Sequence, residues 1–142
     1  MSLLQTKFFV PPQRTDLVTR SHLLQQLTDG WQQRRRLTLI SAPAGYGKTT
    51  LMATWLYALA GREDDVKQSW LSLDVADNDP VRFLSYWLAA FSRIDSALGQ
   101  SAHSLLSLPQ LPPIPTIFDE LINDLAQLEA QVILVLDDYH LI

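Results

Sequence analysis

Apolar and polar positions along the chain follow two periods, one typical of helices and one typical of buried strands. Helical spacing predicts helices within 17–30, 48–60, 79–94 and 116–130. Short apolar runs, as expected for strands buried on both faces, occupy 37–40, 69–74 and 131–138. Strands that alternate with helices predict a parallel, doubly wound sheet, and hence an α/β fold.

Residues with strong end preferences mark several helix boundaries. Thr19 is placed to cap the first helix, and Gly30 to end it. Gly61 follows the second helix in the same way. Asp79 can cap the third helix, with Pro80 at its first position, where a missing N–H costs nothing. These signals predict helix limits as well as helices.

The segment 97–115 is rich in serine and proline, so we expect a long loop, with at most one helical turn within 101–108. A loop of this length is unusual in a compact domain and suggests a mobile insertion. The helix after it is expected to begin with a capping box of Thr116 and Asp119. Its apolar stripe consists of Ile117, Leu121, Leu125 and Leu128.

The two ends of the chain suggest its domain organisation. Pro11 and Pro12 disfavour a helix, so residues 1–15 are predicted to form an extended arm. Residues 16–142 would then form the structured part. Three parallel strands make a thin sheet, and the chain stops at Ile142, directly after the third. We therefore expect 16–142 to be the front portion of a longer domain.

Composition narrows the classes of function. The 142 residues are 47% hydrophobic, enough for a core, and carry a net charge of −4. This balance argues against binding nucleic acid by bulk electrostatics. No cysteine is present, which fits a reducing cytoplasm. The N-terminus lacks a signal-peptide pattern, and no apolar run is long enough to span a bilayer, so we expect a cytoplasmic protein without a membrane partner.

The stretch "APAGYGKTT" at 42–50 has the pattern of a phosphate-binding loop between a strand and a helix. Gly45 and Gly47 allow the tight turns that point backbone N–H groups inward, and Gly47 is the one required most strictly. Lys48 offers charge to the outer phosphates, and the Thr49 hydroxyl can bind Mg²⁺. Ala42 replaces the usual first glycine and fits if its φ is negative. The predicted nucleotide-binding set is Ala44, Gly45, Tyr46, Gly47, Lys48, Thr49 and Thr50.

The apolar run "VILVLDD" ends in two acids, Asp137 and Asp138. Ligands of parallel α/β sheets bind at the carboxyl ends of the strands, so these acids suit the second half of the same site. Asp137 is predicted to hold Mg²⁺ through water, and Asp138 to orient or deprotonate an attacking water. Asp138 and Lys48 are thus the candidate catalytic residues. An apolar strand followed by an ordinary Asp turn is the structural alternative.

Three weaker signals leave two interpretations open each. Arg20, at a helix start, could flank a nucleotide base or be a surface arginine. The run 34–36 could touch DNA or phosphate, or form a solvated loop. Asp74, Asp77 and Asp79 could form a second metal site, although helix capping explains Asp79 without one.

The motifs "TKFFVPPQRTDLVTRSHLLQQL", "LTLISAPAGYGKTTLMATW", "WLSLDVADNDPVRFLSYWLAAF" and "VILVLDDYHLI" together resemble the N-terminal ATPase region of the large LuxR-type, MalT-like transcriptional activators. That family belongs to the STAND class of P-loop ATPases, which implies a three-layer P-loop NTPase-type fold. It also implies ATP or ADP with Mg²⁺ as cofactors. Lys48 and Thr49 match its Walker A residues, and Asp137 and Asp138 its Walker B pair. Arg20 matches a base-proximal "hhGRE"-like element, with Thr19 in place of its glycine.

The resemblance implies a slow, switch-like ATPase. In full-length relatives an inducer, self-association and promoter DNA are the partners, and DNA binds to a C-terminal helix-turn-helix that has no counterpart here. Direct nucleic-acid binding by this chain is therefore not expected. Two alternatives stay open: a P-loop ATPase or kinase-type enzyme whose turnover is its function, and a nonfunctional truncated remnant.

Overall fold

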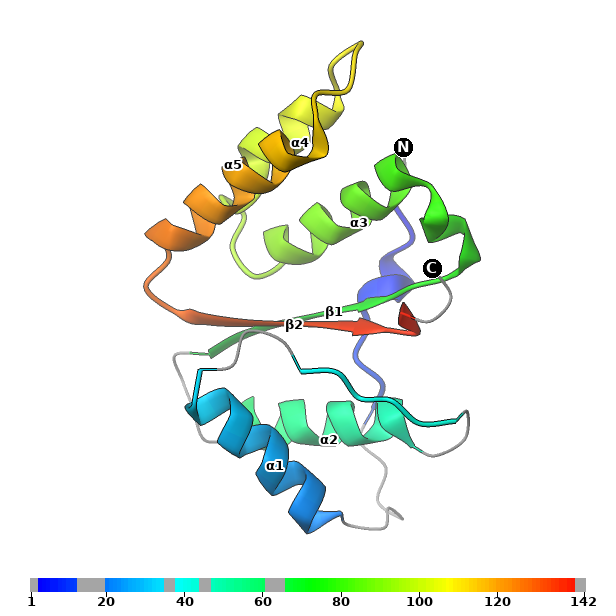
Figure 1. Cartoon of the computed structure of the whole chain (residues 1–142), viewed down its shortest axis with the longest axis vertical. Helices are drawn as coiled ribbons and strands as arrows, with labels where there is room; N and C mark the ends of the chain where they lie inside the picture. The colour runs from blue at the N-terminus through cyan, green and yellow to red at the C-terminus, as the bar shows by residue number, and fades with distance from the viewer. Residues whose placement is uncertain (1–2, 13–19, 35–37, 44–46, 61–65, 140–142) are drawn as a thin grey trace. The chain divides into compact units, whose positions relative to one another are not determined.

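The computed structural model of the chain describes residues 3–12, 20–34, 38–43, 47–60 and 66–139 (Figure 1). The chain divides into two compact units. The smaller unit is Val10–Asp64, and the larger combines Met1–Phe9 with Asp65–Ile142. The larger unit is therefore built from two segments that lie far apart in the sequence.

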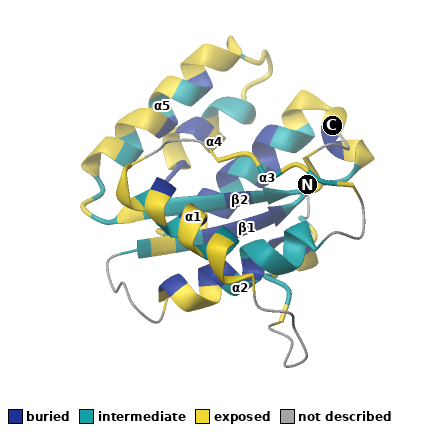
Figure 2. Ribbon diagram, turned by 60° about the horizontal axis from the view of Figure 1, so that its bottom comes forward, coloured by how far each residue is buried: buried dark blue, intermediate teal, exposed yellow. Residues whose placement is uncertain are grey.

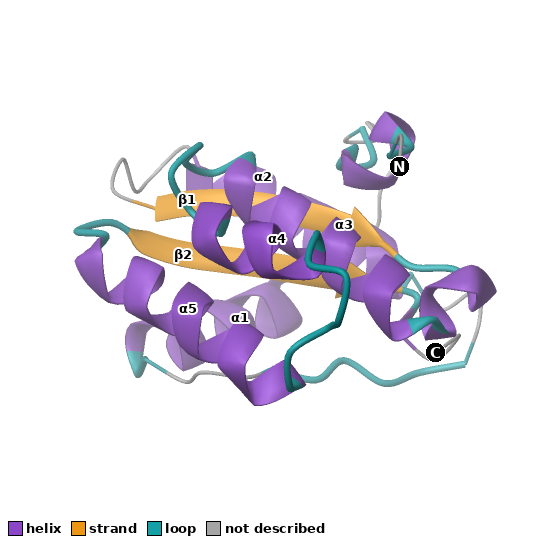
Figure 3. Ribbon diagram, turned by 90° about the horizontal axis from the view of Figure 1, so that it is seen from above, coloured by secondary structure: helices purple, strands orange, loops and turns teal. Residues whose placement is uncertain are grey.

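The larger unit contains a parallel two-stranded sheet of β1 (Val66–Ser72) and β2 (Gln131–Asp137). The strands pair in register from Val66 opposite Gln131 to Ser72 opposite Asp137. A crossover of helices joins them, as parallel pairing requires (Figure 3). These helices are α3 (Pro80–Ser92), α4 (Gln100–Leu106) and α5 (Ile114–Gln127). The mixed composition and the parallel sheet agree with the predicted α/β class, and both strands were predicted.

Alternation along the strands divides the sheet into two faces. Leu71 of β1 packs with Leu136 of β2 and with Tyr86 of α3, and Leu73, just after β1, belongs to the same cluster. A second apolar cluster fills the space among α3, α4 and α5 and includes Leu88, Phe91, Leu98, Ala102, Ile117 and Leu121. Figure 2 shows β1 buried only in part, over residues 69–71, and β2 mostly half-buried, as the residue exposures state. The helices thus form the main core on one face of the sheet.

The N-terminal arm is not extended throughout, in contrast to the prediction. Gln5–Phe8 form a 3-10 helix, η1, and Phe8 is buried against Leu71 and Tyr86. The backbone N–H of Leu4 also donates to the hydroxyl of Tyr86, at 3.0 Å. The prediction relied on Pro11 and Pro12, which restrict only their own neighbourhood. Burial of Phe8 explains why the preceding residues fold onto the larger unit.

The smaller unit contains the two predicted helices, α1 (Ser21–Gln32) and α2 (Lys48–Ala60). The indole N–H of Trp55 in α2 donates to the hydroxyl of Thr28 in α1, at 3.1 Å. Leu56 and Leu59 of α2 are almost fully buried, as its uniformly apolar sequence predicted. The N-cap of α1 is Arg20 and not the predicted Thr19, and the proposed cap Gly61 lies outside the described residues.

Helix α1 does not end at Gly30, as was predicted. Gly30 lies buried inside the helix, which continues to Gln32. Gln33 is the C-cap, and Arg34 follows with a left-handed φ of 59°. The N–H of Arg34 donates to the carbonyl of Trp31, at 2.9 Å. The turn that glycine often makes is here made by an arginine.

The predicted strand at 37–40 is absent from the described residues. Leu37 lies outside them, and Thr38 to Pro43 belong to no helix or strand. Leu39 is 79% exposed, whereas a strand buried on both faces would enclose it. Strands form by pairing with a neighbour, so an apolar run of four residues is insufficient evidence for one.

The segment 97–115 is not simply a loop. Helix α4 makes about two turns, and Leu98 and Ala102 are buried in the core of the larger unit. Packing of these two side chains contradicts the expected mobile insertion. The loop was predicted from the serine and proline content of the segment. A helix this short depends on tertiary contacts more than on the helix propensity of its residues.

Helix α5 begins at Ile114, two residues before the predicted start. Pro113 is its N-cap and makes no side-chain capping bond, so the capping box of Thr116 and Asp119 is wrong. Pro115 sits in the first turn, where its missing N–H is tolerated and allows the earlier start. The predicted stripe is correct: Ile117 and Leu121 are buried, with Leu125 and Leu128 packed against the same cluster. Of the helices among the described residues, none has the length and apolar character that crossing a membrane requires.

Candidate functional site

Gly47, directly before α2, has the backbone conformation that its sequence predicts. Gly47 has a φ of 79°, a left-handed conformation that a side chain would strain. Its carbonyl accepts the first bond of the helix, from the N–H of Leu51 at 2.8 Å. Among the described residues with side chains, only Arg34 and Asp138 have positive φ, so φ is negative at Ala42 and its methyl group fits. Ala44, Gly45 and Tyr46 lie outside the described residues.

Arg20 lies beside this turn, although the two are 27 positions apart in sequence (47 − 20). A Cβ added to Gly47 would be 3.5 Å from Nη2 of Arg20 and 3.7 Å from its Cζ. Arg20 is also the N-cap residue of α1, where its carbonyl accepts from Leu23 and Leu24. The start of α1 therefore brings a guanidinium to the start of α2. The structure thus unites two residues that the sequence suggested only separately.

The first turn of α2 carries the remaining polar groups of the loop. The ammonium of Lys48 donates to the carbonyl of Ala42, so the lysine folds back across the turn. An ammonium has three donors, which leaves it able to bind an anion as well. Thr49 and Thr50 follow, both half-buried. The site therefore combines a helix N-terminus, a lysine and a nearby arginine, all of which favour phosphate.

The acids of the second motif lie at the carboxyl end of β2. Asp137 is the last residue of the strand, half-buried and paired with Ser72 of β1. Asp138 is exposed and has a φ of 60°, and its N–H donates to Oδ1 of Asp137 at 3.1 Å. The turn thus holds one oxygen of the Asp137 carboxylate. Lys48 and Thr49 belong to the smaller unit, and the two acids to the larger.

The predicted donors suit magnesium chemically. Mg²⁺ prefers oxygen ligands and usually retains several waters, so one hydroxyl and one carboxylate suffice from the protein. Thr49 is the predicted source of the hydroxyl and Asp137 of the carboxylate. Asp138 is one position further and exposed to water.

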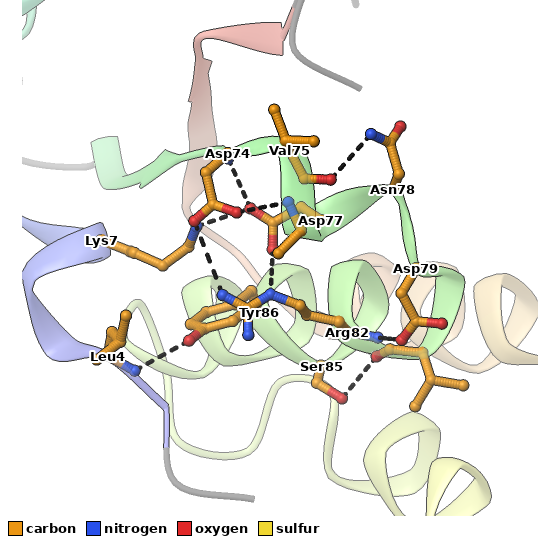
Figure 4. A network of polar contacts seen from close by, with 12 residues as sticks. Leu4, Lys7, Asp74, Val75, Asp77, Asn78, Asp79, Arg82, Ser85 and Tyr86 are labelled. Atoms are coloured by element: carbon orange, nitrogen blue, oxygen red, sulfur yellow. Dashed lines mark hydrogen bonds and ion pairs between the residues drawn. The ribbon is translucent and has the colours of Figure 1, made fainter.

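The acids Asp74, Asp77 and Asp79 are caps and ion-pair partners (Figure 4). Asp79 caps α3 by accepting from the N–H of Arg82 at 3.0 Å, with Pro80 in the first turn, as predicted. Asp74 and Asp77 form a capping box around the 3-10 helix η2 (Val75–Asn78). Among the described residues, no group of three or more His, Cys, Asp or Glu side chains could hold a metal ion, so the structure does not support the alternative of a second metal site here.

Lys7 from the N-terminal arm closes this cluster of acids. Its ammonium lies 2.8 Å from Asp74 and 2.7 Å from Asp77. Burial alone would lower the pKa of Lys7, but hydrogen bonds and charges from both acids outweigh it and raise that pKa above its ordinary value. The hydrogen bond from Lys7 lowers the pKa of Asp74, against a smaller opposing effect of burial.

Two residues of structural importance went unnoticed in the sequence. Lys7 appeared to be part of an extended arm, and nothing local marks it as buried. Ser72 sits opposite Asp137, a relationship that depends on strand register. The capping pair Asp74 and Asp77 was findable, because their spacing of three is that of a capping box.

No family model matches this chain. It is 37% identical over 140 residues to the HTH-type transcriptional regulator MalT of Serratia proteamaculans. It is 36% identical over the same length to MalT of Klebsiella pneumoniae and of Yersinia enterocolitica. The region is MalT-like.

Each alignment with MalT covers 99% of this chain and 15% of the relative. The chain therefore spans about 15% of the length of the curated relatives that it matches. With 140 of 142 residues aligned, both the loop at 42–50 and the acidic end of β2 fall within the MalT-like region. The resemblance expected from the sequence motifs is confirmed.

Proposed function

We propose that the chain is the ATP- or ADP-binding switch portion of a cytoplasmic, MalT-like transcriptional regulator of the LuxR family. In this proposal residues 16–142 are the front part of a three-layer P-loop NTPase domain. The full-length protein would hydrolyse ATP slowly with Mg²⁺, respond to an inducer and self-associate. Promoter DNA would bind to a C-terminal helix-turn-helix and not to this chain.

The observation that carries the proposal is the left-handed Gly47 directly before α2, with the guanidinium of Arg20 against it. A bulky residue cannot easily adopt this backbone conformation. The arrangement brings a cation to a helix N-terminus, which is the chemistry that a phosphate chain requires. The names of the relatives support the regulatory role, since they are transcriptional regulators.

Each predicted residue has a stated role in the proposed site. Backbone N–H groups at 44–50 surround the phosphates, and Lys48 neutralises the outer ones. Thr49 and Asp137 hold Mg²⁺, which would offset charge on the phosphates. Asp138 orients the attacking water or accepts its proton, and its exposure keeps it accessible to solvent. Arg20 contributes a second positive charge beside the turn.

Calorimetric titration of the full-length protein with ADP and with Mg-ATP tests the proposal. Lys48→Ala is expected to abolish binding of both nucleotides. Lys67→Ala is the matched control, because Lys67 is an exposed lysine of β1 outside the loop. Absence of binding to the unsubstituted protein, or equal binding by the Lys48 variant, would contradict the proposal. Turnover then separates a switch from a metabolic enzyme, since a switch hydrolyses slowly and retains its nucleotide.

A further inference from the structure

Ser72 and Asp137 lie side by side at the carboxyl end of the sheet. They are the last paired positions of β1 and β2. Adjacent strands are about 4.8 Å apart, and paired residues of parallel strands project to the same face. The backbone continues this pairing one residue further, because the N–H of Leu73 donates to the carbonyl of Asp137 at 2.9 Å. The relation between the two side chains is therefore held by the sheet.

The face that Ser72 and Asp137 share is opposite the one covered by α3. Leu71 and Leu136 pack on the α3 side, so their neighbours in sequence project the other way. Trp70 and Val135, two residues earlier on each strand, share the face of Ser72 and Asp137. They are only 1% and 7% exposed. The polar pair thus directly follows two buried apolar side chains on this face of the sheet.

Trp70 fixes the role of the Ser72 hydroxyl. The indole N–H donates to Oγ of Ser72, at 3.0 Å. An indole N–H can only donate, so the serine oxygen must accept there. The hydroxyl proton is consequently directed to another acceptor. The carboxylate that strand register sets beside it is that of Asp137.

We propose that Ser72 is a positioning residue of the nucleotide–magnesium site, whose hydroxyl, anchored by Trp70, holds the carboxylate of Asp137 for the cation. This inference rests on the proposed function. Asp137 has two oxygens, and the N–H of Asp138 already holds Oδ1. A second donor from Ser72 fixes the plane of the carboxylate. Groups that orient a metal ligand in this way commonly contribute a factor of roughly 10 to 100 to metal affinity.

The test measures how Mg²⁺ tightens ADP binding to the full-length protein, by titrating ADP in EDTA and at increasing MgCl₂. Ser72→Ala is expected to lower the apparent Mg²⁺ affinity by about tenfold or more. ADP affinity in EDTA should stay unchanged. Ser72→Thr, which keeps the hydroxyl, should restore the Mg²⁺ effect. Ser69→Ala is the matched control, because the hydroxyl of Ser69 is on the other face of β1 and donates to Ala90.

Ser72→Ala could also act through structure alone, because it leaves the buried indole N–H of Trp70 without its acceptor. A second substitution at Trp70 separates the two effects. Trp70→Phe removes the donor, so the double variant carries no unpaired group. The inference expects the double variant to lose Mg²⁺ affinity relative to Trp70→Phe alone. Equal Mg²⁺ affinity of these two variants, or of Ser72→Ala and the unsubstituted protein, would overturn it. If the full-length protein binds no ADP, the proposed function fails and the inference fails with it. If ADP binds in a Lys48-dependent way but its Mg²⁺ dependence is unchanged by Ser72→Ala, only the inference is overturned.

Discussion

The ammonium of Lys7 donates to the carboxylate of Asp77 at 2.7 Å, across 70 positions of sequence. The Asp77 side chain has no exposed surface, and that of Lys7 is 7% exposed. The other oxygen of Asp77 accepts from Nε of Arg82 at 3.1 Å. Tyr86 lies below both cations, with its ring centre 4.9 Å from the Lys7 ammonium and 5.1 Å from the Arg82 guanidinium. A buried charge network therefore attaches the N-terminal arm to the larger unit.

Lys7→Met is expected to destabilise the larger unit by roughly 2–4 kcal/mol. The methionine would fill most of the space, but Asp77 would remain buried with one of its two cations. Removing a single partner from a buried ion pair costs more than the pair contributes, because the remaining charge cannot regain its hydration. Hydrogen exchange of the α3 amides measures the change in the free energy of opening.

Thr6→Ala is the control for Lys7→Met, since Thr6 lies in the same 3-10 turn but is exposed. A surface substitution of this kind should change the opening free energy by less than about 0.5 kcal/mol. Similar exchange rates in both variants would show that the buried ammonium adds nothing beyond the contacts of the arm.

The same network makes stability depend on pH at both extremes. The folded pKa of Asp74 is lowered, so its contribution is complete above the unfolded pKa and disappears as the pH falls through the folded value. The folded pKa of Lys7 is raised, so its contribution is complete below the unfolded pKa and disappears as the pH rises through the folded value. The network should thus be fully stabilising between about pH 5 and pH 10.

Asp74→Asn tests the acid side of this dependence. Asparagine keeps the capping oxygen that accepts from Ala76, but it cannot titrate. Stability measured from pH 6 down to pH 3 should fall less steeply in this variant. Lys7→Met should flatten the same part of the profile, because Lys7 is the main cause of the lowered pKa. If stability falls as steeply between pH 6 and pH 3 in both variants as in the unsubstituted protein, the acid dependence arises from other groups.

Local chemistry and long-range contacts explain which elements the sequence predicts. The start of α3 was correct because Asp79 and Pro80 act on the backbone beside them. The two strands were correct because each contains a short run with apolar residues that is followed by a polar turn. The strand predicted at 37–40 and the loop predicted at 97–115 were wrong because long-range contacts decide both. A strand needs a neighbour to pair with, and burial of Leu98 and Ala102 stabilises the helix α4.

The end of α1 supplies a prediction of its own. Arg34 has a φ of 59°, which costs a residue with a side chain about 1 kcal/mol or more. Arg34→Gly removes this strain, although glycine also gains freedom in the unfolded chain. We expect a net stabilisation of roughly 0.5 kcal/mol, measured by hydrogen exchange of the α1 amides. Gln33→Gly is the matched control: Gln33 is also exposed, but its φ is −78°, so glycine there should destabilise.

The candidate site was only partly predictable, for similar reasons. The residues of the loop are contiguous, so their spacing in the sequence is sufficient to propose them. Arg20 became a stronger candidate only when the fold brought its guanidinium to Gly47. Ser72 could not be proposed at all, because its relation to Asp137 is a matter of strand register.

Substitutions at the two ends of the loop should show that nucleotide binding requires Gly47 but does not require a glycine at position 42. Ala42→Gly should change ADP affinity little, because φ at Ala42 is negative and its methyl group is already accommodated. Gly47→Val should abolish binding, since a β-branched residue cannot readily adopt a φ of 79° and its methyl groups would also meet the Arg20 guanidinium. Calorimetric titration of ADP, with circular dichroism to verify folding, compares them. Equal losses of affinity in two folded variants would mean that backbone conformation at Gly47 is not what the nucleotide requires.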